Sequence, residues 1–113
     1  MKRNNKYIAK LRGAPVGYKE IDFKYEIDTR ILSKVLIDPD TKKDDAMKLA
    51  EWLLDRYYSD NQFIRIAIFD DIDTARYFNN NDNLETKLDK HYLILVTASK
   101  NTGYKNIKWM KKE

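Results

Sequence analysis

The sequence predicts a single α+β domain, in which one main helix packs on a single-layer mixed or antiparallel sheet of four to five strands. Its 113 residues are close to the commonest size for one domain. One segment alternates apolar and polar residues, as a strand with one solvated face does, and a later segment repeats apolar residues at helical spacing. Two further compact apolar runs are typical of central strands.

The first two strands are predicted over residues 21–27 and 31–37. In the first, apolar and aromatic residues alternate with charged ones at a period of two. A short polar break at residues 28–30 separates the two segments. This spacing predicts a β-hairpin.

The main helix is predicted to follow the turn at residues 38–40 and to end near residue 58. Thr41 has Asp44 three residues later, a variant of the capping box that places the start of the helix there. The predicted buried face consists of Ala46, Met47, Ala50, Leu53, Leu54 and Tyr57.

The second half of the chain predicts two central strands and a last strand or docked tail. The apolar runs cover residues 63–69 and 92–98, and Asp73 is predicted to cap a short helix over residues 74–78 between them. Tyr104, Ile107 and Trp109 indicate the last strand. The order is then β-β-α-β-(α)-β-β, with a right-handed crossover that makes the strands on either side of the main helix parallel.

One consequence concerns the face of the sheet opposite the main helix. The central strands are apolar on both faces, so that second face also needs cover. The short helical segments, the chain termini or a second copy of the chain could supply it. The last option would make the protein a homodimer.

The whole chain, residues 1–113, is expected to form one domain with basic arms at about 1–17 and 99–113. Residues 1–24 hold seven basic and two acidic residues, and residues 97–113 hold five basic and one acidic. Cations neutralise phosphates and aromatic rings stack on bases, so nucleic-acid binding by the termini is one hypothesis. The residues assigned to it are Lys2, Arg3, Lys6, Tyr7, Lys105, Lys108 and Trp109. The alternative interpretation is that these charges are simply solvated.

A second binding candidate is Trp52 on the main helix. At about 100° per residue, Trp52 lies away from the predicted buried face and shares the outer face with Lys48 and Arg56. Trp is enriched at interface hot spots, so these three residues form a candidate site for a protein partner. The alternative is that a terminal arm or a polar loop folds over Trp52.

The remaining candidate is acidic. Asp70, Asp71 and Asp73 follow an apolar strand directly, and carboxylates at such a position can hold a hard divalent cation. A metal-dependent hydrolase is therefore a further alternative. The competing interpretation is a solvated turn in which Asp73 caps the next helix.

Other catalytic signatures are absent from the sequence. There is no cysteine, His91 is the only histidine, and the three glycines do not have the spacing of a phosphate-binding loop. We therefore expect no cofactor, and an enzyme is disfavoured. No apolar run reaches about 18 residues, so we expect no membrane contact and a cytoplasmic protein, or a secreted one if a signal peptide was removed.

These patterns favour a non-catalytic module that binds another macromolecule, chiefly through protein–protein contacts at the Trp52 face or by pairing along an exposed strand edge. The composition is rich in Lys, Asn, Ile and Tyr. This composition is typical of AT-rich genomes, which indicates an accessory protein of a bacterium or phage.

Overall fold

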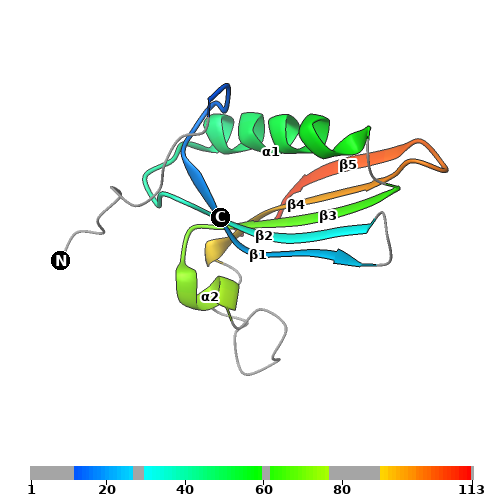
Figure 1. Cartoon of the computed structure of the whole chain (residues 1–113). Helices are drawn as coiled ribbons and strands as arrows, with labels where there is room; N and C mark the ends of the chain where they lie inside the picture. The colour runs from blue at the N-terminus through cyan, green and yellow to red at the C-terminus, as the bar shows by residue number, and fades with distance from the viewer. Residues whose placement is uncertain (1–11, 27–29, 60–61, 77–89, 113) are drawn as a thin grey trace.

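A computed structural model of the chain describes residues 12–26, 30–59, 62–76 and 90–112 (Figure 1). The elements in these ranges confirm the predicted order and the α+β class. They are β1 (Tyr18–Glu26), β2 (Arg30–Ile37), α1 (Lys43–Tyr58), β3 (Phe63–Phe69), α2 (Ile72–Arg76), β4 (Tyr92–Ser99) and β5 (Tyr104–Trp109).

The five strands form one mixed sheet in the order β1-β2-β3-β4-β5. β2 and β3 run parallel, and every other neighbouring pair runs antiparallel. The predicted hairpin is confirmed by the pairing of Glu26 with Arg30. The predicted parallel pairing is confirmed as well, and α1 joins the two parallel strands.

The main core lies between α1 and one face of the sheet, which we call the α1 face (Figure 1). Ile66 and Ile68 of β3 and Val96 of β4 are fully buried there. α1 contributes Ala46, Leu49, Ala50, Leu53 and Leu54 to this core. Leu49 was missing from the predicted face, whereas Met47 and Tyr57 lie at its edge and are only partly buried.

The predicted cap of α1 is wrong. The N-cap residue is Lys42, and no side-chain hydrogen bond caps the helix. Asp38 organises the preceding turn instead: its Oδ1 accepts from the backbone N–H of Asp40 at 2.9 Å, and its carbonyl accepts from the N–H of Thr41 at 2.9 Å. Thr41 therefore belongs to this turn and lies before the helix.

The other face of the sheet is covered at one end by α2 (Figure 1). A small second core there consists of Ala67, Phe69, Ala75 and Tyr92. The Phe69 and Tyr92 rings stack with centroids 5.1 Å apart. In the part of the chain that the structure describes, α2 thus supplies some of the cover that the apolar central strands require. Neither described helix combines the length and the apolar character of a membrane-spanning segment.

Candidate functional site

The half of the sheet beyond α2, on the face opposite α1, carries the most unusual surface of the described chain. The register aligns its side chains in rows across β2 to β5, because directly paired residues point to the same face. We call this surface the open sheet face. Its first row is Arg30, Phe63, Ser99 and Tyr104, and its second row is Leu32, Arg65, Thr97 and Asn106. The third row, Lys34, Ala67, Leu95 and Lys108, borders the small core under α2, in which Ala67 is buried and against which Leu95 packs.

The accessibility of these rows contrasts with that of the α1 face. Arg65 and Lys108 are exposed, and Phe63 and Thr97 are half-buried. Among the described residues, Tyr104 is the one large apolar or aromatic side chain that is exposed, with 52% of its surface accessible. The Tyr104 ring is therefore accessible to a partner from solvent.

The charge of these strands is one-sided. β2, β3, β4 and β5 contain no Asp or Glu at any position. Four of their cations, Arg30, Lys34, Arg65 and Lys108, lie on the open sheet face by register. On the neighbouring strand β1, Asp22 pairs in register with Lys34, and Glu26 pairs with Arg30. The part of the face on β3, β4 and β5 is therefore cationic, with Arg65 and Lys108 as its charges.

One aromatic residue of this face already contacts a cation. The Arg30 guanidinium lies over the Phe63 ring, 5.8 Å from its centroid. Such a pair combines charge attraction with stacking of two planar groups. The Arg30 guanidinium thus covers part of the Phe63 ring, as Arg56 does at Trp52, whereas the Tyr104 ring at the other end of the row is exposed.

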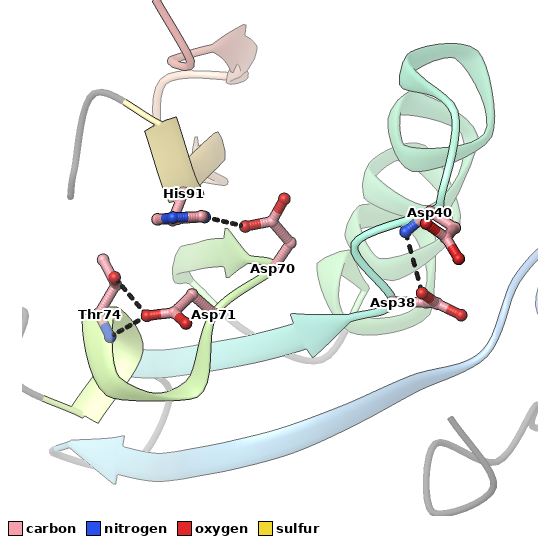
Figure 2. A network of polar contacts seen from close by, with 6 residues as sticks. All are labelled: Asp38, Asp40, Asp70, Asp71, Thr74 and His91. Carbon is pink, nitrogen blue, oxygen red and sulfur yellow. Dashed lines mark hydrogen bonds and ion pairs between the residues drawn. The ribbon is translucent and has the colours of Figure 1, made fainter. Parts of the chain in front are cut away.

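A polar cluster lies where β3 ends and β4 begins (Figure 2). His91 Nδ1 is 2.7 Å from Asp70 Oδ1, and the Asp70 N–H donates to the carbonyl of His91 at 3.2 Å. An ionised carboxylate only accepts hydrogen bonds, so Nδ1 carries the hydrogen in that state. Burial raises the pKa of the Asp70 carboxyl above its usual value, against the lowering by His91 and Lys111. This pair ties the two strand ends together.

Asp71, and not Asp73, caps the short helix. Asp71 Oδ2 accepts from the N–H of Thr74 at 3.0 Å and from its Oγ1 at 2.7 Å (Figure 2). The predicted cap at Asp73 is wrong because α2 begins at Ile72, which places Asp73 inside the first turn. The acidic side chain of Asp73 there still favours the helix through its dipole.

The three aspartates of the metal hypothesis thus have separate positions. Asp70 contacts His91, Asp71 caps α2 and Asp73 is exposed on the helix. Within the described ranges, no group of three or more His, Asp or Glu side chains is arranged to hold a metal ion. This geometry gives the hydrolase alternative no support.

Trp52 lies partly inside the molecule. Its ring packs edge-on against Tyr18, with centroids 5.9 Å apart, and Gly13 approaches its Nε1. Ala14 in the same segment is buried in the α1-face core. The segment that contains Gly13 and Ala14 thus lies against Trp52, in agreement with the alternative in which a terminal arm folds over the ring. Helical periodicity alone could not find this contact, because it depends on where a distant part of the chain lies.

The other two residues of that candidate site remain on the outer surface of α1. Lys48 and Arg56 are both exposed. The Arg56 guanidinium lies over the Trp52 ring at 5.2 Å from its centroid. Arg56 therefore covers part of the ring that a partner would have to reach.

The C-terminal residues of the nucleic-acid hypothesis divide between the two faces of β5. Lys108 lies on the open sheet face, opposite Leu95. Trp109 is half-buried against the α1-face core, with Lys43 Nζ 4.9 Å from its ring centroid. Lys105 Nζ lies 4.1 Å above the Tyr58 ring on the same side. The N-terminal residues of the hypothesis, Lys2, Arg3, Lys6 and Tyr7, lie outside the described residues.

Sequence reasoning also missed a polar contact at the α1 face. Glu20 Oε2 accepts from Tyr57 Oη at 3.0 Å and from Ser33 Oγ at 3.4 Å. Burial, and then the Glu20 carboxylate beside the hydroxyl, raise the pKa of Tyr57 to about 12. Nothing in the sequence pattern signals this role, because Glu20 lies before the predicted strand at residues 21–27, whereas β1 begins at Tyr18. The β-bulge between Glu20 and Asp22 shifts the alternation.

The comparisons with known proteins add no further constraint on function. No family model, curated protein sequence or solved structure matches this chain.

Proposed function

We propose that the protein is a non-catalytic module that binds a negatively charged macromolecule through the open sheet face. The observation that carries this proposal is the distribution of charge on β2 to β5, which supply cations and no acid. A face of one sign attracts a partner of the opposite sign and suppresses wrong partners.

The exposed aromatic side chain of Tyr104 favours this surface as the binding site over the surface at Trp52. Tyr104 is 52% exposed on the open sheet face, whereas Trp52 is covered in part by Tyr18 and Arg56. Tryptophan, tyrosine and arginine are the residues that most often dominate the binding energy at protein interfaces. Tyr104 and Arg65 are accordingly the two residues expected to contribute most.

The proposal can be tested by site-specific photocrosslinking of the full-length chain in cells of its source. A photoreactive phenylalanine derivative replaces Tyr104 in one variant and Lys48, exposed on the outer surface of α1, in the matched control. We expect adducts from position 104 that are absent from position 48. Adding Arg65→Glu to the first variant should abolish them, because it reverses a charge on the face.

Two results would overturn the proposal. One is an equal yield of adducts at positions 104 and 48, which would make the contacts nonspecific. The other is an adduct at position 104 that persists with Arg65→Glu, since the charge of the face would then not determine binding. Duplicate samples treated with nuclease separate nucleic-acid adducts from protein adducts.

A further inference from the structure

We infer that the partner of the open sheet face is single-stranded nucleic acid, with Phe63 and Tyr104 stacking on bases and Arg65 and Lys108 contacting phosphates. This inference rests on the proposed function and names the partner class of that same surface. It differs from the sequence-based hypothesis, which placed the contacts on the two chain termini.

The first step concerns the two aromatic rings. Phe63 of β3 and Tyr104 of β5 both pair with Ser99 of β4, so they flank one small residue in a single row. Two strand spacings separate their backbones, about 10 Å. Ser99, a small residue, is the one side chain of the row between the two rings, so a single strand could contact both of them.

The second step concerns the cations relative to that row. Arg65 is two residues along β3 from Phe63, and Lys108 is four residues along β5 from Tyr104. Residues two apart on a strand lie on the same face, about 7 Å from each other. Arg65 therefore lies beside the aromatic row, and Lys108 lies two rows away, about 13 Å along the strand from Tyr104. A strand whose bases lie on that row would carry its phosphates past Arg65 and Lys108.

The third step concerns the groups between the cations. Thr97 and Asn106 pair with each other in the second row, between Arg65 and the edge of β5. A hydroxyl and an amide can donate and accept hydrogen bonds with base edges or sugars. No acidic side chain interrupts the surface along β3, β4 and β5.

These features distinguish a single strand from the other polyanions. Unpaired bases offer their ring faces to aromatic side chains, and the same combination of stacking platform and cations is the general mode of single-strand binding. In a duplex the ring faces of the bases are stacked between neighbouring base pairs. Its phosphates could contact Arg65 and Lys108, but no base would stack on Phe63 or Tyr104. An acidic protein surface would use the cations as well, without a group that stacks flat on both rings.

The test measures binding of a fluorescein-labelled single-stranded DNA of about 12 nucleotides and mixed sequence to the purified full-length protein by fluorescence anisotropy. We expect Tyr104→Ala to weaken binding about 5- to 150-fold, the loss that one base–aromatic stack produces. Arg65→Gln should weaken binding and reduce the slope of log K against log salt by about 0.7.

Lys48→Gln is the matched control for Arg65→Gln, because it removes one exposed cation from the outer surface of α1. It should leave both the affinity and the salt slope unchanged. Thermal melting of all variants, followed by circular dichroism, verifies that they remain folded. The exposure of Tyr104 makes its removal compatible with folding.

Three results would overturn the inference. The first is unchanged affinity in Tyr104→Ala, because base stacking would then not occur at this face. The second is equal affinity for a duplex of the same sequence. The third is no binding at low salt. If position 104 still crosslinks to a protein in nuclease-treated cells, the third result leaves the proposed function in place with an acidic protein as partner. If the crosslinks are also absent, both proposals fall.

Discussion

The two faces of this sheet are made from the same strands but have different physical properties. Along β2, residues alternate between fully buried positions under α1 and half-buried or exposed positions on the other face. Ile31, Val35 and Ile37 have no exposed surface, whereas Leu32 and Lys34 are only partly buried. The α1 face therefore provides the hydrophobic driving force for folding.

The opposite face divides into two halves. At one end α2 packs over Phe69 and Tyr92 and forms the small second core. At the other end lie Phe63, Arg65 and Tyr104, in a region that no described helix covers (Figure 1). Most of the buried apolar surface that stabilises the fold therefore lies on the α1 face. The part of the opposite face beyond α2 contributes less to stability, so its residues can serve binding.

The largest expected difference between the two faces appears when two adjacent residues of β3 that point to opposite faces are each replaced by alanine. Ile66 is fully buried on the α1 face, and Arg65 is exposed on the open sheet face. Ile66→Ala should lower the free energy of unfolding by about 2–5 kcal/mol, because it leaves a cavity in the main core. Arg65→Ala should change it by only about 0.5 kcal/mol. Urea unfolding followed by circular dichroism measures both.

Equal losses in the two variants would contradict the comparison. They would mean that Arg65 is packed as tightly in the folded protein as Ile66 is. In that case the open sheet face would not be available to a partner, and the proposed function would fail with it.

The second prediction concerns how far the core of the α1 face extends beyond the helix. Trp52 is half-buried against Tyr18 and the segment that contains Ala14. Trp52→Ala should therefore lower the free energy of unfolding by about 2 kcal/mol, roughly half the cost of removing a fully buried Trp. Thermal or urea unfolding measures this loss, with Lys48→Ala as the control on the same helix.

A stability of Trp52→Ala close to that of the control would reverse this interpretation. It would show that Trp52 contributes little to the fold, and the sequence-based site of Trp52, Lys48 and Arg56 would regain its place as a binding surface.

Most of the fold could be predicted from the sequence because period and composition report local structure directly. The alternation in β1, the apolar run of β3 and the helical spacing in α1 each depend on neighbours within one element. The caps were missed for a related reason. Asp71 and Asp73 are equally good capping residues, and Thr41 belongs to the turn at Asp38 instead of capping α1. Both outcomes depend on backbone turns that the pattern does not encode.

The candidate site could be predicted only in part, because it depends on register. The sequence shows that β2 to β5 hold no acid, but not that Phe63, Ser99 and Tyr104 form one row. A slip of one residue in the pairing of β5 with β4 would move Tyr104 to the α1 face. Trp109 illustrates the risk: it was grouped with Lys108 as a ligand contact, and its neighbouring position places it against the core.

The smallest predicted effect concerns Asp70, at the edge where α2 covers the sheet. Burial raises the pKa of its carboxyl above the ordinary value of 3.8. The native state therefore retains a proton that the unfolded state has already lost, so the free energy of unfolding should fall as pH rises above about 4. Asp70→Asn cannot ionise, yet its Oδ1 can still accept from His91 Nδ1–H.

Urea unfolding at several pH values above about 4 should show the natural protein losing stability relative to Asp70→Asn as pH rises. Asp73→Asn, on the exposed surface of α2, is the matched control. The opposite slope would mean that attraction to His91 and Lys111 outweighs burial. The Asp70–His91 contact in Figure 2 would then be an ion pair that stabilises the junction of β3 and β4. Its attraction would exceed the cost of burying the Asp70 carboxylate.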